Sequence, residues 1–308
     1  MNPVVTEDAG KSREVLGRIP ITASIVGVQK GATSTMHTML TRHRLVAPTY
    51  ANDPKRAERR WHFAGKELHF FDDEEQDWSA PDFRHYYGTK IARQQKIAVD
   101  ATPSYIFWPD ALERMRAFNP EMKLIASFRD PIERAFSQWS MGRKQRNAYP
   151  EFSQAIEEYD DVSMLDRVPP GAGRWTVHRK SMVIRGLYGA QLERGLVHFD
   201  RSQWLLLNFS AWIKDYTEAL DELTDFLGIH RFRKYPSLRL NPTPEAHVGT
   251  PPSEADVTRL AERYADDLAL FEKLSGFDVS GWPTRRIAVG EMTAAELAGK
   301  FAAKFVTD

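Results

Sequence analysis

The stretch "SIVGVQKGATSTMHTML", residues 24–40, predicts a buried β-strand that runs into a glycine-containing turn and then into a helix. A phosphate-binding loop occupies this kind of position, because the N-terminus of a helix favours bound anions. The lysine, however, precedes the glycine, at Lys30-Gly31, and no Gly-Lys-Ser/Thr follows, as the loop that binds nucleoside triphosphates requires. The stretch therefore predicts an anion site of another kind.

This turn offers two kinds of donor to an anion. Its backbone N–H groups coincide with the positive end of the following helix, and three hydroxyl side chains come directly behind the glycine. Lys30 adds a charge that can stabilise negative charge developing on a leaving oxygen. In the alternative interpretation, the small residues only cap the helix. The predicted anion-binding residues are Lys30, Gly31, Ala32, Thr33, Ser34 and Thr35.

A second stretch, "KLIASFRDPIERAFSQW" at 123–139, repeats the order of strand, turn and helix, with Asp130 before a proline as the predicted helix cap. Arg129 can offer two parallel N–H groups to a phosphate, and Ser137 supplies a hydroxyl from the new helix. Alternatively, Arg129 only pairs with Asp130 or Glu133. Two anion sites at the ends of neighbouring strands imply one ligand with two separated anionic groups.

Apolar runs alternate with helical patterns along the chain, which favours an α/β fold: a central, mainly parallel sheet flanked by helices. Ligands of such sheets bind beyond the carboxyl ends of the strands. The segment 141–180 is predicted to be irregular around one short helix, 235–256 to be a proline-rich loop, and Gly228 to end a helix. The predicted strands cover 21–28, 96–99, 123–128 and 203–208, and the predicted helices cover 110–118, 131–144, 211–227 and the tail segment 293–305.

The composition restricts the function classes. The 42 basic residues balance 42 acidic ones, which argues against a general attraction to nucleic acid or to an anionic membrane. Cysteine is absent, which excludes disulfides and thiolate sites. With neither a secretory signal nor a membrane-spanning stretch recognised, we expect a soluble, cytoplasmic protein. We predict a single domain over 1–308, with a core of about 20–283, an N-terminal extension 1–19 and a C-terminal tail 284–308.

The two turn motifs carry a family resemblance. "GVQKGATST" resembles the 5′-phosphosulfate loop of sulfotransferases that use 3′-phosphoadenosine 5′-phosphosulfate (PAPS), and "FRDPIERAFSQW" resembles their 3′-phosphate motif. The resemblance implies a P-loop, nucleotide-kinase-like fold and in-line transfer of a sulfuryl group to a hydroxyl or amine. Adenosine 3′,5′-bisphosphate would be the product, with Lys30 stabilising the leaving oxygen. Arg129 and Ser137 would hold the 3′-phosphate, and Tyr188 would either approach the adenine or pack a helix.

Three further motifs resemble the heparan sulfate 3-O- and N-sulfotransferase branch: "KELHFFDDE" at 66–74, "ATPSYIFWP" at 101–109 and "IRGLYGAQLERGLVHF" at 184–199. All five motifs occur in the expected order over roughly 21–230. The chain departs from that branch near its C-terminus, where a basic Lys-Gly-Arg loop is replaced by "RLNPTPEAHVGT" with Arg239 as a substitute. The cysteines and the N-terminal membrane anchor of the animal enzymes are absent, so we expect a cytoplasmic, bacterial-type enzyme.

The resemblance also implies a catalytic base. Glu67 matches the general base of the family, and His69 is placed to support it or to substitute for it. If "ELHFF" is extended, Glu67, His69 and Phe71 share one face; the alternative is an exposed strand end with ordinary charges. The predicted acceptor-binding residues are Lys66, Asp72, Thr102, Ser104 and Tyr105.

Several features remain open between two interpretations. Tyr105, Trp108, Trp139 and Trp175 line an acceptor pocket or belong to the core. The spacing of His62, His69 and His85 fits no metal-ligand signature, so no metal is predicted. A basic set could hold a glycan or be a solvated face: Arg143, Lys144, Arg146, Arg174, Arg179 and Lys180.

The acceptor class follows from none of these motifs, so a small molecule, a glycan and a natural product all remain candidates. Two other functions compete with sulfuryl transfer. One is an ATP-dependent small-molecule kinase, which the missing Gly-Lys-Ser/Thr and the lack of a clear magnesium carboxylate oppose. The other is a non-catalytic nucleotide sensor that keeps both anion sites.

Overall fold

The computed structural model describes residues 17–47, 66–83, 86–90, 92–145, 149–169, 172–237 and 247–306. Five parallel strands form the sheet in the order β2 (Val46–Ala47), β4 (Ile97–Asp100), β1 (Gly17–Gly27), β5 (Lys123–Phe128) and β6 (Trp204–Asn208). The short strand β3 (Tyr87–Lys90) pairs antiparallel with the beginning of β1. The predicted central, mainly parallel sheet is confirmed.

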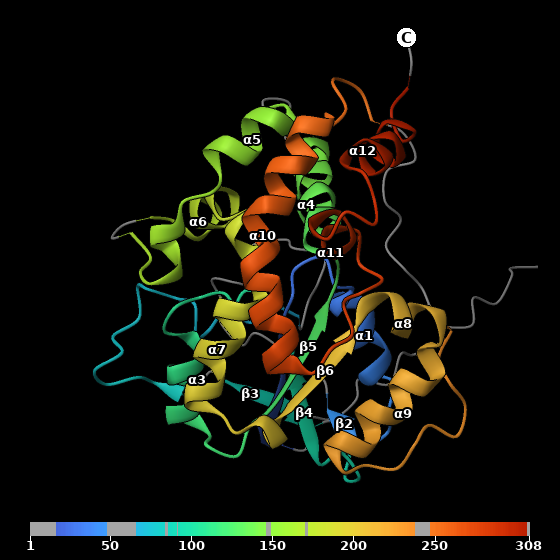
Figure 1. Ribbon diagram of the computed structural model, residues 1–308. Helices are drawn as coiled ribbons and strands as arrows, with labels where there is room; N and C mark the ends of the chain where they lie inside the picture. The colour runs from blue at the N-terminus through green and yellow to red at the C-terminus, as the bar shows by residue number, and fades with distance from the viewer. Residues whose placement is uncertain are drawn as a thin grey trace, which may run out of the picture.

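Both faces of the sheet are covered because successive side chains of a strand point to opposite sides. On one face, Val26 of β1 and Leu124 of β5 join the larger hydrophobic cluster, against α3 (Ala111–Phe118), α7 (Tyr188–His198) and α10 (Glu254–Ser275). On the other face of the sheet, Ile25 and Ile125 join a second hydrophobic cluster. This cluster packs against α1 (Thr33–Leu40), α8 (Phe209–Lys214) and α9 (Tyr216–Leu227). Figure 1 shows the two groups of helices on opposite sides of the strands.

The predicted strands and helices occur with small shifts, and four differences have physical reasons. The helix predicted over 211–227 is divided, because Asp215 caps α9 by accepting from the Glu218 N–H. The segment 141–180 holds two helices after α4 (Pro131–Gln145), namely α5 (Phe152–Glu158) and α6 (Arg174–Lys180), rather than one. The strands β2 and β3 are too short to produce a pattern. The long helix α10 starts inside the predicted loop, where Ser253 and Asp256 form a capping box.

The C-terminal tail packs on the body of the molecule. It contains α11 (Pro283–Ala288) and α12 (Ala294–Ala302), the latter within the helix predicted over 293–305. The Phe301 ring stacks on Phe136 of α4 with a centroid distance of 4.3 Å, and the Thr284 N–H donates to Asp130 Oδ2 at 2.8 Å. None of the helices in the described ranges combines the length and hydrophobicity that a membrane crossing needs.

Candidate functional site

The turn between β1 and α1 is pressed against the carboxyl end of β5. A Cβ atom at Gly31 would overlap the carbonyl oxygen of Ser127, so only glycine fits there. Lys30 and Ala32 on either side adopt left-handed conformations with φ of 74° and 58°. Such conformations cost of order 1–3 kcal/mol for residues other than glycine and cluster at ligand sites. The N-cap residue of α1 is Ala32, whose methyl side chain makes no capping hydrogen bond to the first turn of the helix.

Lys30 lies among other cations. Its Nζ atom is 3.6 Å from the sulfur of Met141 on α4. Burial, followed by the charges of Arg129, Arg134 and Lys66, lowers the pKa of Lys30 from 10.5 to about 8. The β1–α1 turn and the β5–α4 turn therefore share one positive field, and an anion bound between them would offset it.

The turn between β5 and α4 confirms the predicted cap. Asp130 accepts from the Glu133 N–H at 2.9 Å, and burial raises the pKa of Asp130 to about 6. Arg129 does not pair with Asp130; its Nε donates to Glu133 at 3.1 Å, one of the alternatives considered, and its guanidinium lies over the Phe209 ring at 5.0 Å. Ser137 lies two turns further along α4 and is almost buried.

Tyr188 is packed among other aromatic side chains. It is completely buried, and its ring contacts Phe128, Phe271 and Trp282. Its hydroxyl donates to the Arg129 carbonyl at 2.8 Å. Tyr188 therefore stabilises the backbone of the second turn, as the packing alternative predicts, and its approach to an adenine stays a prediction.

The segment 66–72 is not the extended strand that the alternation suggested. Glu67 and His69 have φ of 59° and 51°, and Phe71 lies in the core instead of sharing their face. The loop that follows β4 holds this segment in place. The Phe70 N–H donates to the Tyr105 hydroxyl at 2.9 Å, and the Glu67 N–H donates to the Ala101 carbonyl at 3.2 Å.

The side chains of this segment form a charged chain. Lys66 Nζ contacts Ser34 Oγ of the first turn at 2.5 Å and Glu67 Oε1 at 2.6 Å. Glu67 Oε2 lies 3.6 Å from His69 Nε2, and His69 Nδ1 lies 2.7 Å from Asp72 Oδ2. Lys66 thus links the predicted anion turn directly to the predicted base.

The charges of the chain are strongly coupled. Burial alone would raise the pKa of Glu67, but its hydrogen bond to His69 and the Lys66 charge lower it to about 2. Burial would lower the pKa of His69, but Asp72 raises it to about 9. The pKa of Asp72 is held well below its usual range, against its burial, by His69 and Arg174. At neutral pH, His69 is therefore a cation, whereas Glu67 is an ionised carboxylate.

Two more of the predicted acceptor-binding residues contact carboxylates in this region. Ser104 Oγ donates to Asp72 Oδ2 at 2.6 Å, and Thr102 Oγ1 lies 3.0 Å from Asp100 Oδ1. Tyr105, Trp108 and Trp139 are completely or almost completely buried, as the core interpretation predicts, and their contact with an acceptor stays a prediction.

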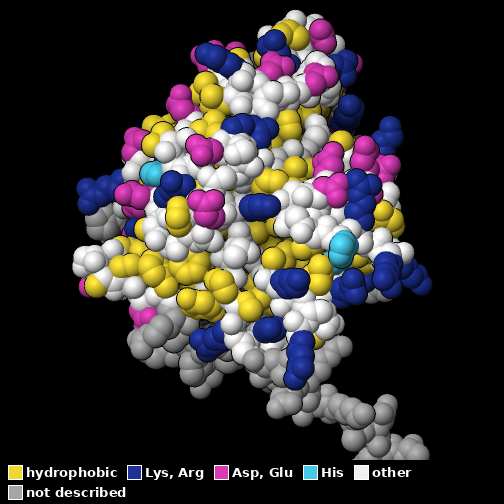
Figure 2. Space-filling model, turned by 90° about the horizontal axis from the view of Figure 1, so that it is seen from below, with side chains coloured by type: hydrophobic (Ala, Val, Ile, Leu, Met, Phe, Trp, Pro, Cys, Tyr) yellow, Lys and Arg dark blue, Asp and Glu magenta, His cyan; other side chains and the backbone are white. Residues whose placement is uncertain are grey.

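Some predicted residues fall outside what the structure describes: Arg239, Arg146, His62, His85 and the side chain of Trp175. Of the basic set, Arg143 pairs with Glu151 at 2.6 Å, and Arg174 lies 3.8 Å from Asp72. Basic and acidic side chains are interspersed among hydrophobic ones on the face shown in Figure 2. Within the described ranges, no group of three or more His, Cys, Asp or Glu side chains is arranged to hold a metal ion.

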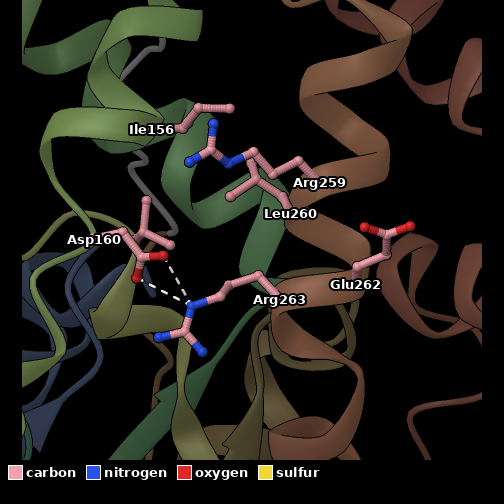
Figure 3. A pocket seen from close by; sticks show the side chains of 7 residues that line it. Ile156, Asp160, Arg259, Leu260, Glu262 and Arg263 are labelled. Carbon is pink, nitrogen blue, oxygen red and sulfur yellow. Dashed lines mark hydrogen bonds and ion pairs between the residues drawn. The ribbon is translucent and has the colours of Figure 1, made fainter.

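A hollow of about 310 Å³ between α5 and α10 lies apart from these residues (Figure 3). Its lining includes Arg263, which donates through Nε to both carboxylate oxygens of Asp160, at 3.1 and 2.9 Å. None of the predicted site residues lines it.

Sequence reasoning missed four residues around the first turn: Gln29, Arg134, His178 and Arg185. Arg134 is completely buried, and its guanidinium donates to Gln138 and to the Met182 carbonyl. Gln29 Nε2 lies 3.3 Å from His178 Nδ1, and Arg185 Nη1 donates to Gln29 Oε1 at 3.4 Å. The available signal was a charged residue inside an otherwise apolar stretch, Arg185 in "VIRGLYG".

Comparison with known proteins shows the family of the chain. A family model described as "Sulfotransferase family" matches residues 23–233. Heparan sulfate glucosamine 3-O-sulfotransferase 3B1 of Mus musculus is 28% identical over 211 residues, which cover 68% of this chain and 46% of the relative. The bifunctional heparan sulfate N-deacetylase/N-sulfotransferase 4 of Mus musculus is 23% identical over 205 residues, covering 67% of this chain and 22% of the relative. The chain thus spans less than half the length of these two relatives.

A solved structure supports the fold. The sulfotransferase from Alicyclobacillus acidocaldarius aligns with a TM-score of 0.63 at 20% identity, covering 86% of this chain and 99% of that one. The P-loop-like fold predicted from the motifs is therefore confirmed, independently of what the site residues do.

Proposed function

Because the chain belongs to the sulfotransferase family, we propose that it transfers the sulfuryl group of PAPS to a hydroxyl or amine of a small-molecule, glycan or natural-product acceptor. PAPS supplies the activated sulfuryl group: its sulfur–oxygen bond to the 5′-phosphate breaks as the bond to the acceptor forms. The observation that carries the proposal is the set of cations around the buried Lys30: burial, followed by the charges of Arg129, Arg134 and Lys66, lowers the pKa of this lysine to about 8. A ligand with phosphate and sulfate groups would neutralise them.

In this proposal the two turns divide the donor between them. The N–H groups and hydroxyls of residues 31–35 hold the 5′-phosphosulfate, and Lys30 stabilises the oxygen that gains charge as the bond breaks. Arg129 and Ser137 hold the 3′-phosphate, for which Arg129 exchanges its contact with Glu133. The fit is supported by α1, whose N-cap, Ala32, has no side chain that could cap its N–H groups.

Glu67 is the proposed base for the acceptor. Its carboxylate accepts the proton of the attacking hydroxyl or amine, and the exposed fraction of its side chain, 39%, makes it reachable. His69 is charged at neutral pH because its pKa is raised to about 9, so it has no free lone pair for that proton. The His69 cation instead orients Glu67, and Asp72 in turn orients His69.

Binding of adenosine 3′,5′-bisphosphate, measured by titration calorimetry, tests the proposal. AMP lacks the 3′-phosphate and would leave Arg129 and Ser137 without their partner. A charge-assisted contact is worth roughly 1.5–3 kcal/mol, so the bisphosphate should bind at least about tenfold more tightly than AMP or ATP. Equal affinities would contradict the assignment. Binding without release of bisphosphate from PAPS, across a broad acceptor panel, would favour the sensor.

The same titration has a proton signature. At pH 8 about half of the Lys30 side chains are protonated in the free protein, because the pKa is about 8. A bound anion raises this pKa, so binding should take up about half a proton. Titrations in two buffers of different ionisation enthalpy measure the uptake. The Lys30→Met variant should lose it, and an unchanged uptake in that variant would contradict the placement of the anion beside Lys30.

A further inference from the structure

Arg185 is a buried cation whose environment is incomplete. It lies on the short 3₁₀ helix η3 (Ile184–Gly186) between α6 and α7, with an exposed fraction of 3%. Its Nε donates to Ser181 Oγ at 2.7 Å, and its guanidinium lies over the Phe107 ring at 4.5 Å. The Nη2 atom has no hydrogen-bond partner among the described residues, although it is buried.

The completely buried Arg134 resembles Arg185 in having no ion pair among the described residues, whereas two partly buried arginines have charged or polar partners. Arg263 is neutralised by Asp160 (Figure 3), and Arg194 donates to three backbone carbonyls. Arg185 forms no ion pair with any described residue, and burial, followed by the charge of Arg134, lowers its pKa to about 9. A buried charge without a partner costs several kcal/mol. An arrangement of this kind is expected where an external anion completes the site.

Arg185 also lies close to the turn that carries Lys30. Its Nη1 contacts Gln29, the residue directly before Lys30 in the first turn. The charges of Asp72 and Glu67 act to raise the pKa of Arg185, so the segment 66–72 is within electrostatic range. Arg185 is therefore close to the turn that holds the lysine that would stabilise the leaving oxygen, and it is within electrostatic range of the carboxylate that would accept the proton. A transferring sulfuryl group has to pass between these two.

We propose that the Arg185 guanidinium binds the non-bridging oxygens of the sulfuryl group, held in place by Gln29 and Ser181. The inference rests on the proposed function. Lys30 acts on the bridging oxygen, whereas Arg185 acts on the oxygens that travel with the sulfur from donor to acceptor. Arg185 would therefore distinguish PAPS from adenosine 3′,5′-bisphosphate, which has no sulfuryl group.

The experiment compares Arg185→Met with Arg263→Met, which removes a partly buried arginine remote from the site. Dissociation constants for PAPS and for the bisphosphate are measured by calorimetry, and folding is checked by thermal melting. Loss of a charge-assisted contact should weaken PAPS binding about tenfold or more in Arg185→Met. Bisphosphate binding should stay within about threefold, and Arg263→Met should bind both ligands as the wild type does.

If Arg185 only supports the turn through Gln29, both ligands weaken equally in Arg185→Met, and the inference is wrong while the proposed function stands. If the wild-type protein binds neither ligand, the proposed function itself fails. Arg185→Lys keeps the charge but loses the planar fork. The Arg185→Lys variant should lose part of the preference for PAPS over the bisphosphate. If Arg185→Met does not fold, the ratio of the two dissociation constants in Arg185→Lys tests the inference in its place.

Discussion

At the scale of single residues, the division of work between Glu67 and His69 comes from their neighbours. Both are candidate bases by residue type, yet Asp72 raises the pKa of His69 to about 9, and His69 with Lys66 lowers that of Glu67 to about 2. A carboxylate with so low a pKa is a weak base while it is paired. An acceptor that displaces Lys66 or His69 from Glu67 would raise this pKa and strengthen the base.

Two variants separate the roles. Glu67→Gln keeps the shape but removes the basic oxygen, so kcat should fall about 10²–10⁴-fold, the typical contribution of general-base catalysis. His69→Gln should lower kcat less, because it removes only the orienting cation. Steady-state kinetics with an acceptor that the wild type sulfates gives both values. Unchanged affinity for adenosine 3′,5′-bisphosphate serves as the control for folding. An active Glu67→Gln beside an inactive His69→Gln would assign the base to His69.

At the scale of elements, the segment 66–72 is held in shape by the loop that follows β4. Residues 66–72 have no regular structure, and their N–H groups donate to the loop after β4. Asp100, the last residue of β4, and Thr102 of that loop are within 3.5 Å of the N–H groups of Leu68 and His69. Tyr105 thus supports the segment that carries Glu67, the proposed base.

Tyr105→Phe tests this support. Removing the hydroxyl leaves the buried Phe70 N–H without its acceptor, which should cost roughly 1–3 kcal/mol of unfolding free energy. Because the loop shifts, kcat should fall while bisphosphate affinity stays, since the β1–α1 turn is untouched. Tyr235→Phe is the matched control and should leave kcat unchanged. This variant also loses one hydroxyl, which donates to Asp221 at a place in the chain far from Tyr105. Loss of bisphosphate binding in Tyr105→Phe would contradict the separation of the two loops.

At the scale of the whole molecule, the C-terminal helices complete the environment of α4, the helix that carries Ser137. Phe301 of α12 stacks on Phe136, and Thr284 of α11 donates to the Asp130 cap. His247, after the last gap in the described residues, contacts Ser140 of the same helix at 3.3 Å. Segments far apart in sequence thus stabilise the β5–α4 turn and the helix that follows it.

The Phe301→Ala variant measures this contribution. Phe301 is 2% exposed, and truncating a buried phenylalanine typically costs about 3–5 kcal/mol of unfolding free energy. Chemical denaturation should show that loss as a lower midpoint. Val306→Ala, at a position 53% exposed, should change stability by less than about 0.5 kcal/mol. A Phe301→Ala protein as stable as the wild type would show that α12 contributes little to the fold.

The sequence alone determined four strands of the sheet, the two turns after β1 and β5, and the family. Each depends on local chemistry that a few adjacent residues carry: an apolar run, a glycine where no Cβ fits, an aspartate before a proline. Tertiary structure decided the rest. Whether Glu67 or His69 carries a proton depends on Asp72 and Lys66, and the burial of Tyr105 and Tyr188 depends on helices and loops from elsewhere in the chain. Arg185 lies 155 residues from Lys30 in sequence, and its contact with Gln29 exists only because the chain folds back. Burial and electrostatic coupling depend on which residues the fold brings together, and the order of residues in the sequence does not show this.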